Sequence, residues 1–464
     1  MKSVNLSLVS HTNQGKTTLV RTLLREDVGE VLDQAHVTDE KVPNELIATD
    51  EAKLVLWDTP GFGDSARLLK RLEGHDDPLG WFTSQVVDRM TDRPLWCSQQ
   101  AVHNVREDAD LVLYLVNGSE SPDGAGYLEP ELRILEWIGK PAIVLLNQTG
   151  PPRDAEGTRA EVERWRAWAA KHLLIRDVIS LDAFTRCWVQ EGVLFERVVD
   201  SLAEEARATM RALVEAWHER NAVSFQGSIA AVARFLTAAA TDRVPLEKND
   251  MAERRNASTR LREDVRRRMR ELSHSLIELH GLTGRSEREI ETDIADLVLP
   301  APAADDRRSA IWGGVLGGLG GGLLADVFSG GLTLGGGMIG GTLVGLLGGL
   351  GYSRTQKVLK NEDAPALTWT PDFLKRLTSE SLLLYLAVAH YGRGRGDYRD
   401  LDQPKHWNEA IATALSGRME GLSSAARKGG SPFEALLRTV LEDVLRRLYP
   451  ESGPTLSRAS TPKT

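Results

Sequence analysis

The stretch Val-Ser-His-Thr-Asn-Gln-Gly-Lys-Thr, residues 9–17, decides the fold of the first part of this chain. It follows an apolar, alternating run at residues 4–9 and opens into a segment of helical character at residues 18–24. A strand, a tight turn and a helix that begins at Gly-Lys-Thr form the setting of a phosphate-binding loop, because unpaired N–H groups and the helix dipole favour a negative ligand. The pattern G-x-x-x-x-G-K-[ST] is met except at its first position, where Ser10 lacks the backbone freedom of glycine. The stretch therefore predicts a polyphosphate site.

The loop also predicts the roles of single residues. Lys16 is expected to reach the β- and γ-phosphates and to stabilise the charge that is transferred, and the Thr17 hydroxyl is expected to bind Mg²⁺. The other predicted nucleotide contacts of this loop are Asn13, Gln14, Gly15 and Thr18.

A second motif stands where the apolar strand at residues 54–57 runs into Asp-Thr-Pro-Gly at residues 58–61. In a P-loop hydrolase the aspartate orients the water shell of Mg²⁺ and the glycine N–H meets the γ-phosphate. Asp-x-x-Gly alone is a common turn, but its place at the end of a buried strand downstream of Gly-Lys-Thr favours the hydrolase interpretation. Asp58 is therefore a predicted metal residue and Gly61 a predicted catalytic one.

Two further apolar runs, at residues 111–116 and 142–146, are short and do not alternate, which is typical of strands buried on both faces. Helical segments separate them, and this repetition predicts a parallel sheet. The predicted fold class is α/β: a P-loop domain with a mostly parallel sheet, then an all-helical C-terminal region with an apolar, glycine-rich hairpin.

Over residues 1–190 the chain resembles the Era/TrmE branch of the translation-factor GTPases, through Asn13 ahead of Gly-Lys-Thr, the Asp-Thr-Pro-Gly motif and Asn147 at a strand end. The resemblance implies that GTP and GDP are the ligands, with hydrolysis assisted by Mg²⁺. It also implies that Thr38 closes over Mg²⁺ and that Asn13 holds a K⁺ ion in place of an arginine finger. Phe62 stands where Ras-like enzymes carry a catalytic glutamine, so water activation must come from elsewhere.

The base motif departs from this family. The family pattern is Asn-Lys-x-Asp, whereas residues 147–150 read Asn-Gln-Thr-Gly. The missing carboxylate would accept two hydrogen bonds from guanine, and at about 1.5–3 kcal/mol each their loss removes roughly 10²–10⁴ of discrimination. Either another residue accepts these bonds or the base is read loosely. Asp182, in the Ser-Leu-Asp-Ala stretch at 180–183, is the candidate substitute.

Length and composition set the wider limits. A chain of 464 residues with 41% hydrophobic and 27% charged residues is expected to form two or three globular domains. The net charge of −9 makes nucleic acid an unlikely partner. Two cysteines without a spacing motif, and the lack of a signal-peptide core, suit a reducing cytoplasm.

Helical periodicity replaces the strand pattern in the second half. The predicted parts are a GTPase domain at 1–190, a helical domain at 191–305, a glycine-rich hairpin at 306–355, a helical domain at 356–450 and a disordered tail at 451–464. One long helix is expected around residues 195–217, and the segment 254–270 carries eight arginines. The arginines are either a solvated helix face or a basic strip for anionic lipid or nucleic acid.

The glycine-rich stretch at residues 309–353 contains one charged residue, Asp326, and 18 of the 42 glycines. Many of these glycines are four apart, so on a helix they would align as a flat stripe that allows close packing. Basic residues flank both ends and none lies between, which predicts a hairpin with both ends in the cytoplasm. A membrane hairpin is the favoured interpretation. A glycine-zipper hairpin buried in protein and a flexible linker remain as alternatives.

The sequence as a whole resembles bacterial proteins that join an Era-like GTPase domain to a C-terminal domain of unknown function. It predicts a GTP-hydrolysing switch on the cytoplasmic side of the inner membrane, or in the cytoplasm, with membrane lipid as a partner and homodimerisation as one way to complete the site. The alternatives are a cytoplasmic ribosome- or RNA-associated GTPase and a non-hydrolysing nucleotide-binding scaffold.

Overall fold

The computed structural model describes residues 1–25, 42–73, 93–150, 153–183, 186–248, 250–282, 350–353, 366–391 and 405–459. The chain divides into two compact units. The first comprises residues 1–222, 390–397 and 449–464, and the second comprises residues 223–389 and 398–448. Each unit is described by itself below.

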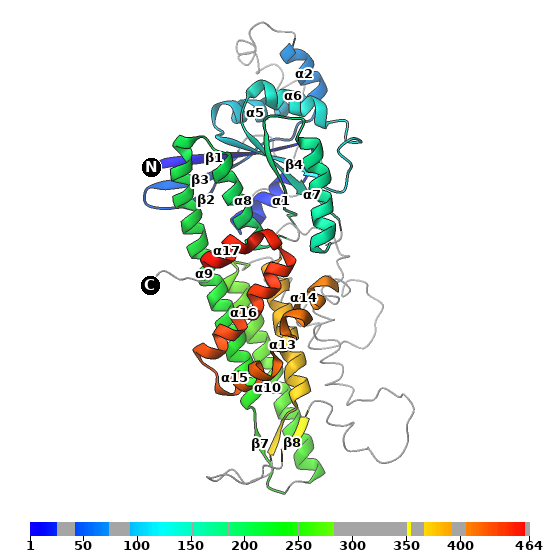
Figure 1. Ribbon diagram of the computed structural model, residues 1–464, viewed down its shortest axis with the longest axis vertical. Coiled ribbons are helices and arrows are strands. Elements are labelled where there is room, and N and C mark those ends of the chain that lie inside the picture. Colours follow the sequence, from blue (N-terminus) through cyan, green and yellow to red (C-terminus); the bar gives the residue numbers. More distant parts are fainter. Residues whose placement is uncertain are drawn as a thin grey trace. The chain divides into compact units, whose positions relative to one another are not determined.

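The first unit is built on a six-stranded sheet with the order β2-β3-β1-β4-β5-β6 (Figure 1). Only β2 is antiparallel to its neighbour, and the other pairs of strands are parallel. The predicted α/β class with a mostly parallel sheet is therefore confirmed. The strands are β1 (Lys2–Ser10), β2 (Val42–Ala48), β3 (Ala52–Asp58), β4 (Leu111–Asn117), β5 (Ala142–Asn147) and β6 (Ile175–Ser180).

Helices cover both faces of this sheet, so its central strands need side chains that are apolar on both sides. Val112, Tyr114 and Val116 of β4 point to one face, where they join a buried cluster with residues of α2, α5, α6 and α7. Figure 1 shows α1 and α8 on the other side of the sheet. The helices are α1 (Lys16–Leu24), α2 (Ser65–Glu73), α5 (Arg93–Glu107), α6 (Leu128–Ile138), α7 (Ala155–Ala169) and α8 (Trp188–Ser201).

The helix expected around residues 195–217 is in fact two helices. Helix α8 ends at Ser201, Leu202 is extended with ψ 157°, and α9 (Glu204–Thr241) follows. Glu204 and Glu205 lie in the first turn of α9, where negative charge is favoured by the helix dipole. A break this short leaves the apolar period almost unchanged, so periodicity alone did not reveal it.

The predicted boundary at residue 190 and the predicted disordered tail also differ from the structure. The first unit continues to residue 222 and also includes the C-terminal segment from residue 449. There the short helix η3 (Pro450–Ser452) leads into α17 (Gly453–Ala459), whose Thr455 and Leu456 are buried. A Cβ on Gly192 would lie 2.5 Å from Thr455 Cγ2, so α8 and α17 pack with almost no space between them. The polar composition of this segment predicted disorder. The prediction was wrong because the segment packs against α8, which is far away in sequence and leaves no local signal.

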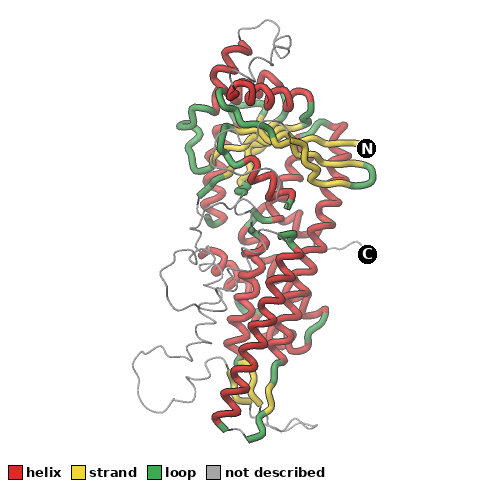
Figure 2. The backbone as a smooth tube through the Cα atoms, turned by 180° about the vertical axis from the view of Figure 1, so that it is seen from behind, coloured by secondary structure: helices red, strands yellow, loops and turns green. Residues whose placement is uncertain are grey.

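The second unit is largely helical, as expected, and its long helices run side by side in Figure 2. It also contains a small antiparallel sheet in the order β7-β9-β8, which the sequence did not predict. Apart from β8 at residues 350–353, the glycine-rich stretch lies outside the described residues. The elements are β7 (Val244–Pro245), α10 (Met251–Leu279), β8 (Leu350–Ser353), β9 (Ala366–Trp369), α13 (Pro371–Ala389), α14 (Lys405–Leu415), α15 (Met419–Lys428) and α16 (Ser431–Leu448).

Candidate nucleotide site

The loop between β1 and α1 has the backbone that a phosphate cradle requires. Asn13 and Gly15 have positive φ values of 62° and 81°. A Cβ on Gly15 would lie 2.7 Å from Asn147 Nδ2, so only glycine fits there. Ser10 ends β1 as a strand residue and is not among the described residues with positive φ, so its side chain causes no strain at the first position of the motif.

Lys16 lies inside this cradle and is almost fully buried. Its Nζ donates a hydrogen bond of 2.9 Å to Ser10 Oγ, and a Cβ on Gly61 would lie only 3.0 Å from the same nitrogen. Burial lowers the pKa of Lys16, while the nearby carboxylates of Asp58 and Glu131 act in the opposite direction. The lysine charge therefore stands between the loop and Gly61, while its contact with phosphate stays a prediction.

The predicted metal residues Thr17 and Asp58 lie in direct contact. Thr17 Oγ1 donates a hydrogen bond of 2.8 Å to Asp58 Oδ2. Asp58 Oδ1 is buried and has no hydrogen-bond partner in the described part of the chain. Burial raises the pKa of Asp58, opposed by Lys16 and by the hydrogen bond from Thr17. A hydroxyl beside a carboxylate with one unused oxygen suits a hard cation such as Mg²⁺. Thr38, the third predicted metal residue, lies outside the described residues.

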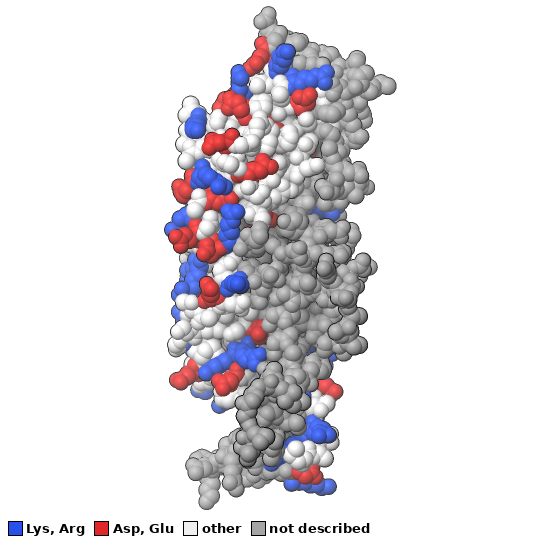
Figure 3. Space-filling model, turned by 90° about the vertical axis from the view of Figure 1, so that its right-hand side faces the viewer, with Lys and Arg blue, Asp and Glu red and all other residues white. Residues whose placement is uncertain are grey.

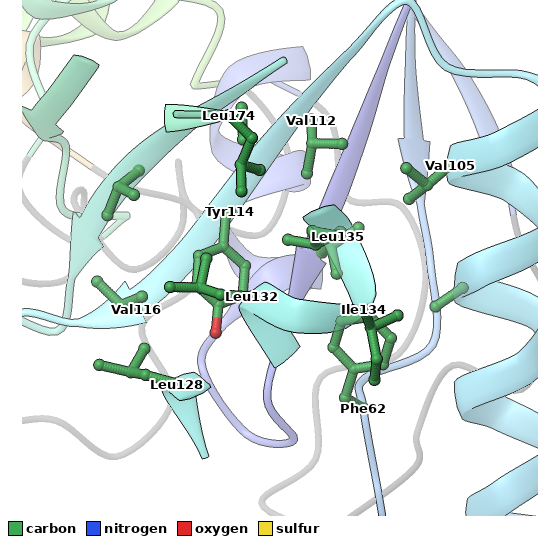
Figure 4. Packing of buried hydrophobic residues seen from close by; sticks show 14 of the residues in the cluster. Phe62, Val105, Val112, Tyr114, Val116, Leu128, Leu132, Ile134, Leu135 and Leu174 are labelled. Carbon is green, nitrogen blue, oxygen red and sulfur yellow. The ribbon is translucent and has the colours of Figure 1, made fainter. Parts of the chain in front are cut away.

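Phe62 is buried and does not face the cradle. It packs into the same cluster as Ile134 and Leu135, as Figure 4 shows. Its N–H donates a hydrogen bond of 2.9 Å to Ser10 O, which ties the start of the segment after Gly61 to the end of β1. The side chain at the position of the Ras-like glutamine therefore belongs to the core, which the sequence analysis had not predicted.

Asn147 connects the phosphate loop to the loop after β6. It is fully buried; its Nδ2 donates to Gln14 O over 2.7 Å, and its Oδ1 accepts from Ala183 N over 2.8 Å. Gln148 Nε2 adds a bond of 3.2 Å to Asn13 O. Asn147 thus holds two loops together through their backbones.

Asp182 lies at the base loop, close to the position of the missing carboxylate. Its Oδ2 accepts hydrogen bonds from Thr149 N over 2.9 Å and from Thr149 Oγ1 over 3.1 Å. Gly150, which replaces the aspartate of the family motif, has φ 80° and open space where a Cβ would stand. The structure therefore brings Asp182 to this loop, while its role in base reading remains a prediction.

Most of the predicted site residues converge on one place, and the structure adds others that the sequence did not suggest. Thr18 is buried in the first turn of α1, and Asn13 is exposed on the loop. The residues that were missed are Ser10, which binds Lys16, and His11, whose Nδ1 lies 2.8 Å from Glu131 Oε1. The sequence signal that could have indicated the contact of His11 is Glu131, a charged residue among the buried positions of α6.

Comparison with known families agrees with this geometry. The profile of the family described as "50S ribosome-binding GTPase" (MMR_HSR1) matches residues 5–148, and the first unit carries a P-loop GTPase domain of the Era-like type. The profile of the family described as "Domain of unknown function (DUF3482)" matches residues 169–435. Because that match spans more than half of the chain, the protein belongs to the DUF3482 family.

Individual relatives are similar over the N-terminal part. GTPase Era of Campylobacter concisus is 27% identical over 115 residues, which cover 25% of this chain and 36% of the relative. GTPase Era of Fusobacterium nucleatum is 27% identical over 148 residues, which cover 32% of this chain and 41% of the relative. The chain thus spans about two fifths or less of the length of these curated relatives.

Two solved structures of Era match part of the chain. An Era variant from Aquifex aeolicus bound to GDP and AlF4⁻ is 21% identical with a TM-score of 0.32, over 44% of this chain and 58% of that chain. Era in complex with MgGDPNP and a segment of 16S ribosomal RNA is 20% identical with a TM-score of 0.33, over 48% of this chain and 67% of that chain.

Proposed function

We propose that this protein is a membrane-associated switch that binds GTP and hydrolyses it to GDP and phosphate. The observation that carries the proposal is the convergence of Lys16, Thr17 and Asp58 in one cradle, where Thr17 Oγ1 lies 2.8 Å from Asp58 Oδ2. The support for hydrolysis is the GTPase domain and this geometry. The curated relatives are matched over only part of their length, so their activity adds no support.

Each residue of the cradle has a task in this proposal. Thr17 and Asp58 would hold Mg²⁺, which would supply positive charge against the charge that develops on the phosphates. Lys16 leaves Ser10 Oγ and donates to the β- and γ-phosphates. Gly61, with no side chain beside Lys16 Nζ, offers its N–H to the γ-phosphate. The cradle therefore binds and positions the phosphates by electrostatics alone.

The proposed intrinsic turnover is slow. Phe62 is buried in the core and cannot orient the attacking water. A K⁺ ion bound by Asn13, or a second copy of this chain, would supply the missing group, as the family resemblance implies. Guanine is the proposed base by the same resemblance, with Asp182 as the carboxylate nearest to the base loop.

Membrane association is proposed from the glycine-rich stretch and from the arginines of α10. Arg262, Arg266 and Arg270 follow one another at four-residue spacing, so they share a helix face. The pKa of Arg266 is lowered by burial and by the charges of Arg262 and Arg270, while the charge of Glu263 acts in the opposite direction. Three arginines on one helix face form a basic strip. Anionic lipid head groups are attracted to such a strip.

A helix in the described residues also has the length and composition to cross a membrane. This is α9, which has a window of mean hydropathy 1.2 that is 50% buried inside the protein. A buried core helix passes the same test, so this helix adds little to the proposal. The proposed location is the cytoplasmic side of the inner membrane, with the cytoplasm as the alternative.

Two other functions follow from single observations. One of the Era structures contains 16S ribosomal RNA, which suggests a cytoplasmic role at the ribosome or on RNA. Against it stand the net charge of −9 and the face in Figure 3, where charges of both signs alternate over the described residues. The degraded base motif, in turn, suggests a scaffold that binds nucleotide without hydrolysing it.

Co-sedimentation tests the membrane proposal. The full chain should pellet with vesicles that contain anionic lipid, and a chain lacking residues 309–353 should not. Pelleting with ribosomes but not with vesicles would favour the RNA alternative. Phosphate release from GTP and from ATP, with and without K⁺, separates the hydrolase from the scaffold, since a scaffold releases phosphate from neither.

A further inference from the structure

A buried glutamate holds the phosphate loop from behind through a histidine. His11, the first residue after β1, places Nδ1 2.8 Å from Oε1 of Glu131 on α6. The other oxygen, Oε2, accepts a hydrogen bond of 2.7 Å from the Tyr114 hydroxyl on β4. Both carboxylate oxygens are therefore occupied, and Glu131 is completely buried. Such a carboxylate fixes both the ring orientation and the tautomer of its histidine.

The imidazole is held on its face as well as on its edge. The ring of Tyr127, next to the start of α6, stacks on His11 with the ring centroids 4.7 Å apart and the planes 18° apart. The His11 side chain keeps 31% of its surface exposed, and its Nε2 has no partner among the described residues. The ring is thus held at Nδ1 and on one face.

His11 is also the residue through which the loop meets the γ-phosphate segment. Its backbone forms an isolated parallel bridge with Phe62, and Phe62 N donates to Ser10 O over 2.9 Å. Gly61, which precedes Phe62, approaches Thr12 Cα and Lys16 Nζ so closely that a Cβ would lie 3.0 Å from each. A shift of His11 would therefore move the Gly61 N–H relative to Lys16.

The charges and hydrogen bonds around Glu131 keep its carboxylate paired. Burial raises the pKa of Glu131, and the bonds from His11 and Tyr114 together with the charge of Lys16 act against that shift. A buried carboxylate is costly unless it is paired. The chain keeps this one directly behind the phosphate loop, in a part of the domain where an apolar residue would pack without that cost.

We propose that His11 is a positioning residue of the GTPase site: held by Glu131 and Tyr114, it fixes the Gly61 N–H for the γ-phosphate. This inference rests on the proposed function. It concerns the discrimination between triphosphate and diphosphate, and it assigns to α6 a direct part in sensing the γ-phosphate. A misplacement of about 1 Å in such a site costs about 10²-fold in rate.

The test compares the full-length wild type with His11→Ala and with the control His172→Ala. His172 also pairs with a glutamate of α6, Glu136, over 3.1 Å, but its ring packs on Trp168 of α7, away from the phosphate loop. Affinities for GDP and for the non-hydrolysable analogue GDPNP are measured by calorimetry, and kcat by phosphate release. His11→Ala should lower kcat about 10²-fold and the GDPNP-over-GDP preference at least about tenfold, with GDP affinity nearly unchanged.

The variant Glu131→Leu, an apolar side chain that can make neither hydrogen bond, should reproduce the loss, and it serves as the second variant if His11→Ala folds poorly. Equal loss of GDP and GDPNP binding, or an unchanged preference in both variants, would overturn the positioning role alone. A wild type that binds neither nucleotide would overturn the proposed function together with this inference.

Discussion

The hydroxyl of Thr17 and the carboxylate of Asp58 meet at 2.8 Å, although they belong to different motifs and lie 41 residues apart in the sequence. Their contact follows from the sheet, because β1 and β3 are parallel neighbours whose carboxyl ends lie at the same edge. Ligands of open α/β sheets bind at that edge. Replacing Asp58 therefore tests the metal site without disturbing the fold.

Asp58→Asn should reduce Mg²⁺-dependent GTP hydrolysis by about 10²-fold, because the amide lacks the charge that orients the metal's water shell. Thr17 Oγ1 can still donate to the amide oxygen, so the melting temperature should stay close to that of the wild type. Phosphate release across a magnesium titration measures the effect. Full activity at low magnesium would contradict the assignment of Asp58.

Lys16→Ala should weaken GTP binding by at least about 10²-fold, since it removes charged hydrogen bonds to two phosphates. Calorimetry with GTP analogue and GDP measures the loss. Lys171→Ala is the matched control, because Lys171 is exposed on the same unit. Unchanged affinity in Lys16→Ala would refute the site.

Asn147→Ala should destabilise the first unit by about 2–4 kcal/mol, because it leaves the carbonyl of Gln14 and the N–H of Ala183 without partners. Urea unfolding measures the change. Asn44→Ala on the edge strand β2, where the side chain reaches only backbone carbonyls of β2 and β3, should cost much less. Equal losses in the two variants would show that Asn147 does not hold the loops together.

Gly150→Asp restores the carboxylate of the family's base motif. There is open space at its Cβ position, although the φ of 80° imposes some strain. The preference for GTP over ATP should rise at least about tenfold, as two charged hydrogen bonds become available. Gly124→Asp, at an exposed turn, is the control for the added charge. No gain in selectivity would indicate that Asp182 already reads the base.

Glu380 gives the second unit a dependence on pH. It lines a cavity of about 400 Å³ between α13 and the α14–α15 turn, and its Oε2 is buried without a partner in the described residues. Burial raises the pKa of Glu380 from 4.5 to about 8, partly opposed by Arg376. The folded state therefore favours the neutral acid. Its contribution to stability is present below about pH 4.5 and is lost as the pH rises through about 8.

Glu380→Gln removes this titration, so the melting temperature of the variant should fall less than that of the wild type between about pH 5 and about pH 9, a range that covers most of the window between the two pKa values. Thermal unfolding followed at several pH values measures the difference. The exposed Glu420→Gln on α15 is the control. Parallel pH profiles for wild type and Glu380→Gln would contradict the assignment.

The local patterns of the sequence determined a large part of this protein. Gly15, Lys16 and Thr17 after a strand predicted the phosphate cradle, because a turn with positive φ and a helix start are encoded by neighbouring residues. The apolar strand that ends at Asp58 and the apolar runs at 111–116 and 142–146 predicted the parallel sheet, because burial on both faces is also encoded by neighbouring residues. Phe62, as an apolar residue in a catalytic position, predicted only that water activation comes from elsewhere, and its place in the core was added by the structure.

Contacts between distant residues were decided only by the tertiary structure. Glu131 lies behind His11 and Asp182 lies beside Thr149 because parallel strands bring helix and loop ends to one edge of the sheet, and no local pattern records which ends meet. The same reason explains the tail, whose α17 is ordered by packing against α8. Hydrophobic period and turn chemistry act over a few residues, whereas the choice of partner for a buried polar group depends on the packing of the whole unit.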